Sequence, residues 1–405
     1  MLGVLSHKVY RRLFAAQVVA LSGTGLATVA LGLLAYQLAG DRAGLVLGLA
    51  LTIKMVAYVL VAPVAAAFVE RVDRRKTLIL LDIVRAAVAV CLPFVSEIWQ
   101  IYVLIFVMQS ASAGFTPAFQ ATIPDILTDE EDYTKALSLS RLAMDLESLL
   151  SPAVAALLLG FVTFSSLFWG TSIGFIASAL LVASVLLPKP IPGPKRPIYE
   201  RTTRGMRLYL ATPRLRGLLA LSWVAAAISA LVIVNTVVIV RSNLGLGDSD
   251  VAILLAGFGG GSMVAALALP KLLNRYTDRI LMLSAGGMSV LVLIGLAIAL
   301  QSTQYAFGAI LVGWFLTGFC YSAILTPSGR LLARSAEPVD RPAVFAAQFA
   351  LSHACWLVLY PLTGALMTYL GLPVTLVIVA VLSGAGVVAA RQLWPAHDIE
   401  EQHPA

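Results

Sequence analysis

Long runs of apolar residues alternate with short polar segments along the whole chain. A helix rises about 1.5 Å per residue, so a run of about 20 apolar residues crosses the hydrocarbon core of a bilayer. Runs of this length predict about twelve transmembrane helices, over residues 13–38, 43–69, 77–95, 101–123, 136–159, 164–187, 217–240, 251–269, 280–300, 306–325, 344–369 and 372–390. The predicted fold is therefore an all-α membrane protein.

The composition supports this prediction. Of 405 residues, 60% are hydrophobic and 12% are charged, whereas soluble chains carry about 25% charged residues. The three cysteines lie in three different apolar runs, so no disulfide framework is indicated. The sequence contains no phosphate-binding loop, nucleophile triad or cysteine-rich metal motif. These absences disfavour an enzyme or an ATP-driven pump, and we expect no cofactor.

Basic residues are distributed unevenly among the polar segments. If the N-terminus is cytoplasmic, only Arg42 and Arg241 fall in the connecting segments on the external side of the membrane, and the other basic residues of these segments lie on the cytoplasmic side. An excess of Lys and Arg on one side sets the orientation, so both termini are predicted to be cytoplasmic, in a bacterial cytoplasmic (inner) membrane. The net charge of +7 then faces anionic lipid headgroups of the bilayer, and no nucleic-acid partner is needed to explain it.

A proline-rich, basic segment from Pro188 to Arg216 divides the chain into halves. We expect a bundle of six helices at residues 1–187, a cytoplasmic linker at 188–216, a second bundle at 217–391 and a cytoplasmic tail at 392–405. Residues 66–75 after the second span correspond to residues 270–279 after the eighth, and Thr116-Pro117 and Ser151-Pro152 recur as Thr326-Pro327 and Tyr360-Pro361. Two pseudo-symmetric repeats around a midplane site are typical of secondary transporters.

The segment from Glu70 to Arg75 resembles the loop motif of the major facilitator superfamily, Gly-x-x-x-Asp-Arg-x-Gly-Arg-Arg, with Ala66, Glu70 and Asp73 as departures. With Asp82 and Arg85 in the next span, it is similar to the branch that exports macrolides and enterobactin. More narrowly, residues 23–25, 54–58, 115–125, 136–142 and 352–356 resemble NreB-type nickel-resistance exporters. Members of that subgroup can carry a histidine-rich tail, whereas this tail offers only His397 and His403.

Arg141, Asp145 and Glu147 are ionisable residues inside an apolar run, where such residues usually serve a function. Arg141 and Asp145 are one helical turn apart and are predicted to pair. Asp145 and Glu147 are about 200° apart around the helix, so they cannot bind one ion together. Either carboxylate is a candidate for proton coupling, with Glu147 preferred. The alternative is that Glu147 is a structural partner of a basic residue on another helix.

A candidate metal site follows from the repeat, which places His353 opposite Met144 and Trp356 opposite Glu147. If this stripe faces a central cavity, Glu147, Met144 and His353 converge, and imidazole with carboxylate and thioether favours nickel or cobalt over magnesium. The same residues suit a proton-coupled exporter of organic molecules. His353 is also open to a simpler role as a hydrogen-bonded packing residue.

Other polar residues complete the candidate site. Lys54 lies well inside the second span and needs a carboxylate partner such as Asp145 or Glu147. Gln109 and Asn235 are placed in the substrate cavity with Lys54, Met144, His353 and Trp356. The resemblance implies a cytoplasmic gate made by Glu70, Arg71, Asp73, Arg74, Asp82 and Arg85.

We therefore expect a monomeric secondary exporter that works by alternating access and exchanges protons for a divalent metal ion, nickel or cobalt. The alternative substrate is a drug-like molecule or a siderophore. A nontransporting membrane sensor is the alternative of another class.

Overall fold

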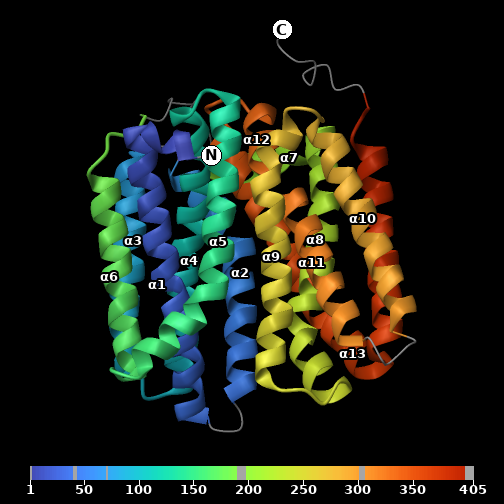
Figure 1. The fold of residues 1–405 in the computed structure, drawn as a ribbon. Helices are drawn as coiled ribbons and strands as arrows, with labels where there is room; N and C mark the ends of the chain where they lie inside the picture. Colours follow the sequence, from blue (N-terminus) through green and yellow to red (C-terminus); the bar gives the residue numbers. More distant parts are fainter. Residues whose placement is uncertain (1, 40–42, 70–71, 189–197, 301–305, 397–405) are drawn as a thin grey trace. The chain divides into compact units, whose positions relative to one another are not determined.

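The computed structural model describes residues 2–39, 43–69, 72–188, 198–300 and 306–396. Glu70 and Arg71 of the predicted gate lie outside the described residues, as do the proline-rich part of the linker and both histidines of the tail. Every regular element in the described part is a helix (Figure 1), which confirms the all-α fold class.

The long helices coincide closely with the predicted spans. They are α1 (Lys8–Ala39), α2 (Ala43–Val69), α3 (Arg74–Cys91), α4 (Ile98–Ile126), α5 (Glu130–Leu159), α6 (Phe164–Ala183), α8 (Pro213–Val238), α9 (Asp248–Leu273), α10 (Asp278–Ala299), α11 (Ala306–Leu325) and α13 (Arg341–Leu393). Two shorter helices, α7 (Ile198–Ala211) and α12 (Ser328–Ser335), lie between them. Among the described residues, ten helices are long and apolar enough to cross a membrane.

Two helices explain why ten such helices correspond to about twelve predicted spans. The 53-residue α13 is broken at Gly371, whose φ of 74° and ψ of 174° are not helical, so it contains the last two predicted spans. The 30-residue α5 is long enough to cross but carries the charged residues of the candidate site. A multi-pass helical membrane protein is thus the observed architecture.

Local sequence sets where several helices begin. Asp73 precedes α3, and its carboxylate accepts a hydrogen bond from the backbone N–H of Lys76 at 3.1 Å. Thr277, at the matching position of the repeat, precedes α10 and accepts from the N–H of Ile280 at 3.3 Å. Such caps satisfy N–H groups that lack a partner in the first helical turn. The gate residue Asp73 therefore has a structural role at the start of α3.

The helices form two compact units, each described by itself. The first contains residues 1–136, 146–208 and 336–353, and the second contains residues 137–145, 209–335 and 354–405. Because α5 and α13 contribute to both units, the predicted division into bundles at 1–187 and 217–391 stays a prediction.

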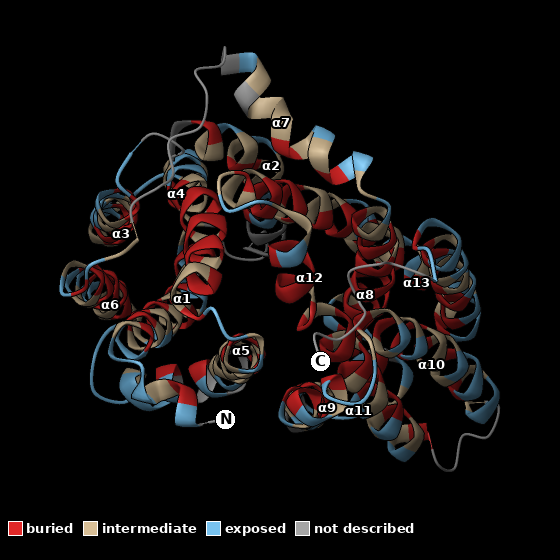
Figure 2. Cartoon of the chain, turned by 90° about the horizontal axis from the view of Figure 1, so that it is seen from above, coloured by how far each residue is buried: buried red, intermediate tan, exposed pale blue. Residues whose placement is uncertain are grey.

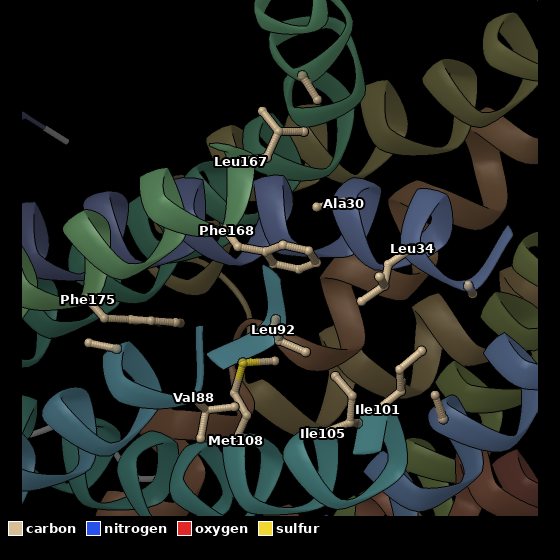
Figure 3. Close-up of a cluster of buried hydrophobic side chains, with 14 of the residues drawn as sticks. Ala30, Leu34, Val88, Leu92, Ile101, Ile105, Met108, Leu167, Phe168 and Phe175 are labelled. Carbon is tan, nitrogen blue, oxygen red and sulfur yellow. The ribbon is translucent and has the colours of Figure 1, made fainter. Parts of the chain in front are cut away.

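In the first unit, α1 packs against α6, α2 against α4, and α3 against both α4 and α6. Phe168, Phe175, Leu92, Ile101 and Met108 belong to the buried cluster between these helices (Figure 3). The outer faces of α3 and α6 are exposed (Figure 2) and apolar, with Leu80, Ile83, Ile173, Ile176 and Leu180 among their side chains. Exposed apolar faces on long helices suit contact with lipid.

In the second unit, α11 packs against α8, α9 and α10. A Cβ added at Gly261 of α9 would overlap the carbonyl oxygen of Phe315, and one at Gly318 of α11 would overlap that of Phe258. Small residues of this kind let two membrane helices approach closely. The glycine run in α9 therefore serves packing.

Candidate functional site

Glu147 lies half-buried on α5 and belongs to the first unit. Ser151, one turn further along α5, donates its hydroxyl hydrogen to Glu147 Oε1 at 3.2 Å. The ammonium charge of Lys54 on α2 also acts on this carboxylate. Lys54 and Glu147 thus belong to one unit, and their predicted association stays a prediction.

An aromatic cluster of Tyr58, Phe349 and His353 lies beside Lys54 in the same unit. Lys54 Nζ lies 5.6 Å from the centre of the Tyr58 ring. That ring lies 4.8 Å from the rings of both Phe349 and His353, and Tyr58 donates its hydroxyl hydrogen to Gln109 Oε1 at 2.8 Å. The structure therefore brings together three residues of the predicted site, Lys54, Gln109 and His353, and adds two aromatic residues to them.

The imidazole of His353 is held by its own helix. Its Nδ1 lies 2.7 Å from the carbonyl oxygen of Phe349, one turn earlier in α13. A carbonyl oxygen only accepts hydrogen bonds, so Nδ1 carries the hydrogen and Nε2 has the lone pair of a neutral ring. His353 thus has the tautomer that a metal-binding histidine needs.

The predicted ion pair between Arg141 and Asp145 is confirmed. Arg141 Nη2 lies 2.8 Å from Asp145 Oδ1, and the guanidinium stacks 4.6 Å from the centre of the Tyr321 ring. Ser262 of α9 donates to Asp145 Oδ2 at 2.6 Å. These residues all belong to the second unit, so Asp145 and Glu147 have different surroundings, as their angular separation on α5 predicts.

Three other predicted cavity residues lie in the second unit. Asn235 is buried and donates to the carbonyl oxygen of Thr363 at 3.3 Å, and buried Trp356 donates to Ser229 Oγ at 2.8 Å. Met144 is half-buried. Each buried polar group has a partner within its unit, and the substrate contact assigned to these three residues stays a prediction.

Arg74, of the predicted gate, is buried at the start of α3 and forms an ion pair with Asp125 near the end of α4. Asp125 also pairs with Arg341, the first residue of α13. The neighbouring Asp340 holds Arg204 of α7 through two hydrogen bonds of 2.6 Å. These ion pairs join the starts of α3 and α13 to α4 and α7. We call the five residues the gate cluster: Arg74, Asp125, Arg204, Asp340 and Arg341.

Asp82 and Arg85 form a separate pair in the interior of the first unit. Arg85 binds Asp82, and Ser178 of α6 donates to the other oxygen of Asp82 at 2.8 Å. The guanidinium lies 4.1 Å from the ring of Phe115 and 4.5 Å from that of Phe175. This enclosure between α3, α4 and α6 suits a structural role, and the gate role implied for the pair stays a prediction.

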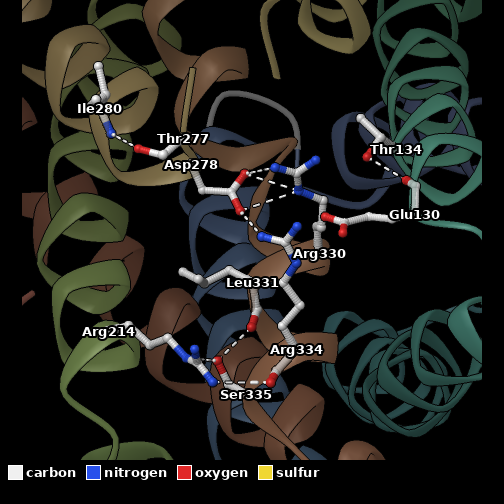
Figure 4. A network of polar contacts seen from close by, with 10 residues as sticks. All are labelled: Glu130, Thr134, Arg214, Thr277, Asp278, Ile280, Arg330, Leu331, Arg334 and Ser335. Carbon is white, nitrogen blue, oxygen red and sulfur yellow. Dashed lines mark hydrogen bonds and ion pairs between the residues drawn. The ribbon is translucent and has the colours of Figure 1, made fainter. Parts of the chain in front are cut away.

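The second unit has an ionic cluster at the repeat position of Arg74 (Figure 4). Asp278, fully buried at the start of α10, lies 2.9 Å from Arg330 Nη2 and 3.2 Å from Arg334 Nη1 of α12. Arg214 at the start of α8 donates to Ser335 Oγ at 2.7 Å. The repeated segment therefore carries a cation in one half and an anion in the other, and each has partners of opposite charge.

Sequence reasoning did not assign Tyr58, Phe349, Asp125, Arg341 or Asp278 to a site. A signal existed for the first two, because Tyr58 and Phe349 stand one helical turn from Lys54 and His353 respectively. No comparable signal links Asp125 with Arg341, which are separated by 216 positions.

The sequence also matches a known family. The model of the Major Facilitator Superfamily matches residues 13–297 and 218–404. The chain belongs to this superfamily. This is a superfamily of multi-pass membrane transporters, which are not enzymes.

The proteins that are similar to this member of the superfamily include an efflux protein. It is 27% identical over 168 residues to "Macrolide efflux protein A" of Streptococcus pyogenes, a match that covers 40% of this chain and 41% of that protein. It is 25% identical over 290 residues to the "Uncharacterized MFS-type transporter YfiS" of Bacillus subtilis, covering 70% of this chain and 68% of that protein. The resemblance to macrolide exporters is supported, and the nickel-resistance branch stays a prediction.

A solved structure shows the same fold. The human organic anion transporter MFSD10 (TETRAN) superposes with a TM-score of 0.80 at 12% identity, covering 95% of this chain and 99% of that chain. At this identity the similarity concerns the fold alone. It confirms the major facilitator architecture predicted for the chain.

Proposed function

We propose that this superfamily member exports an amphiphilic organic molecule in exchange for protons by alternating access. One observation carries the proposal, namely that Lys54 lies beside the ring of Tyr58, which contacts the rings of Phe349 and His353, in the unit that also contains Glu147. The partial match to macrolide efflux proteins supports the direction of transport. We also propose that it works as a monomer, with both termini in the cytoplasm.

The residues of this site suit an amphiphile better than a bare ion. Aromatic rings offer a large apolar surface with low loss of side-chain entropy, and their faces attract organic cations. Gln109 and the charged groups supply a few polar contacts beside the rings, a combination typical of small-molecule sites. A strongly hydrated metal ion gains little from the rings of Tyr58 and Phe349.

Glu147 is the proposed proton carrier. A carboxylate in an apolar segment resists ionisation because water no longer solvates its charge, whereas Ser151 and Lys54 stabilise the ionised form. These opposing effects let protons load and leave during a transport cycle. Asp145 is less suitable, because it is already engaged by Arg141 and Ser262.

Export of nickel or cobalt is the second candidate function. It is favoured by the tautomer of His353, whose Nε2 has the lone pair that a divalent metal needs. Within the described residues, however, no three His, Cys, Asp or Glu side chains come together in a way that would hold a metal ion. A metal ion bound by His353 would therefore need ligands of another kind, such as water.

The deciding experiment uses purified protein in liposomes with an imposed pH gradient. We expect a macrolide or a lipophilic cationic dye to be driven against its concentration gradient, and Glu147→Gln to abolish this proton-driven step while sparing downhill exchange. Calorimetry with nickel and cobalt tests the second candidate, because His353→Ala should weaken metal binding only if that candidate is right.

Matched variants separate the two substrates. Tyr58→Leu removes the aromatic ring and should weaken binding of the amphiphile about tenfold, a loss equal to about 1.4 kcal/mol. It should leave metal binding unchanged. Nickel binding and transport without any response to the organic probes would overturn the organic proposal. Normal proton-driven efflux by Glu147→Gln would move the coupling role to another carboxylate.

A further inference from the structure

Two glycines of α1 contact different helices. A Cβ added at Gly23 would lie 3.1 Å from the carbonyl oxygen of Thr171 and 3.7 Å from Cα of Gly174, both on α6. Thr171 also donates its hydroxyl hydrogen to the carbonyl oxygen of Gly23 at 2.8 Å. Gly23 therefore serves close packing of α1 on α6, which is a backbone role.

Gly25 contacts the functional side chains of α5 instead. A Cβ added at Gly25 would overlap the hydroxyl of Ser151 and would lie 2.5 Å from Glu147 Oε1. The hydroxyl and the carboxylate can rotate away, but the added Cβ would also lie 2.4 Å from Ser151 Cβ, so α1 and α5 must separate slightly at this point. The missing side chain of Gly25 thus leaves the space in which Ser151 donates its hydrogen bond to Glu147.

We propose that Gly25 is a positioning residue for the transport reaction, holding the hydroxyl of Ser151 on the carboxylate of Glu147. The inference rests on the proposed role of Glu147 as proton carrier. It means that α1 helps to determine the pH at which Glu147 binds its proton. The simpler alternative is a packing glycine whose replacement affects only stability. Gly32 offers a matched control on α1, because a Cβ there would meet nothing within 4 Å.

The consequence is a change in the pH dependence of transport. A hydroxyl that donates to a carboxylate favours its ionised form. The charged group that acts on Glu147 from a neighbouring helix is Lys54 of α2, which also acts on His353 of α13. Lys54 is left in place by a change at Gly25, so only the contribution of Ser151 should be lost.

The test compares Gly25→Ala with Gly32→Ala and Ser151→Gly in the liposome assay. Losing a hydrogen bond to a charged group should move the pH of half-maximal proton-driven transport upward by about one unit, because the carboxylate then keeps its proton at higher pH. Gly25→Ala and Ser151→Gly should show this shift, and Gly32→Ala should not. Because both changes act through one hydrogen bond, the double variant Gly25→Ala/Ser151→Gly should shift no further than Ser151→Gly.

Infrared difference spectroscopy provides a readout that does not depend on transport. The carbonyl band of protonated Glu147 is identified as the band that Glu147→Gln removes, and Gly25→Ala should change its frequency as Ser151→Gly does. If Gly25→Ala alone fails to fold, the double variant, in which the overlap with Ser151 is relieved, takes its place. If the positioning role is right, the double variant should show the same carbonyl band and the same pH profile as Ser151→Gly.

The outcomes distinguish this inference from the proposed function. If Gly25→Ala matches Gly32→Ala in both band and pH profile, the positioning role is wrong while Glu147 can still carry protons. If the band changes but Glu147→Gln still performs proton-driven efflux, the contact is right and the coupling role of Glu147 is wrong. A further shift on adding Gly25→Ala to Ser151→Gly would also overturn the inference.

Discussion

At the residue scale, the buried ions of this protein occur as pairs with additional polar or aromatic neighbours. Arg141 and Asp145 bind each other, while Ser262 donates to the second oxygen of Asp145 and the Tyr321 ring lies against the Arg141 guanidinium. An isolated charge in an apolar environment is costly, and attraction between two charges offsets that cost only when other hydrogen bonds complete the pair. The pair is therefore best tested by comparing the loss of one charge with the loss of both.

We predict that Asp145→Asn lowers the free energy of unfolding by about 3 kcal/mol, because it leaves the Arg141 guanidinium without its counter-charge. Thermal unfolding of the detergent-purified protein measures the loss. The apolar pair Arg141→Met/Asp145→Leu should recover most of it, because no buried charge remains. A double variant as unstable as Asp145→Asn would contradict this account of the pair.

At the element scale, the break in α13 separates two spans that would otherwise form one helix of 53 residues. Gly371 has φ 74° and ψ 174°, a region that only glycine occupies without strain. A Cβ at this position would meet nothing within 4 Å, so the requirement for glycine comes from the backbone alone. A helix of this length cannot turn back through the membrane without such a break.

We predict that Gly371→Ala destabilises the protein by about 1–3 kcal/mol through backbone strain. Gly384→Ala is the matched control, because Gly384 is helical on α13 and also has open space around its Cβ position. That control should be neutral or slightly stabilising, since alanine is the better helix former. Melting temperatures of the two variants compare them directly, and equal values would rule out strain at Gly371.

At the scale of the whole molecule, each unit has an ionic cluster where the repeated segment begins a helix. Asp125 binds Arg74 and Arg341 in the first unit, and Asp278 binds Arg330 and Arg334 in the second. The clusters occupy related places although the charges of the repeated position are opposite. Ion pairs that must break and reform are suited to control the rate of a conformational cycle.

We predict that Asp125→Asn and Asp278→Asn change the rate of transport more than the affinity for substrate, because neither carboxylate lies in the proposed binding site. Initial rates in liposomes and binding isotherms in detergent separate these effects. Asp73→Asn is the control, since asparagine caps a helix as well as aspartate does. Weakened binding at an unchanged rate would show that these clusters are not gates.

Prediction from sequence succeeded where neighbours along one helix decide the outcome. The pair Arg141 and Asp145 followed from one-turn spacing, and the separate surroundings of Asp145 and Glu147 followed from helical geometry. Prediction was weaker where partners lie on different helices. Cys91 is exposed whereas Cys320 and Cys355 are buried, a difference that the apolar runs containing them do not indicate.

The sequence by itself determined the membrane class, the position of nearly every span, the superfamily and the contacts one turn apart, because hydrophobic length and helical period are local properties. Only the tertiary structure decided that Tyr58 meets His353, that Asp125 binds Arg341 and that Gly25 makes space for Glu147 and Ser151. Apolar spans are interchangeable in composition, so the pattern along the chain does not specify which faces pack together. Side-chain shape, small residues and buried polar partners specify that pairing, and these act only when the helices are already side by side.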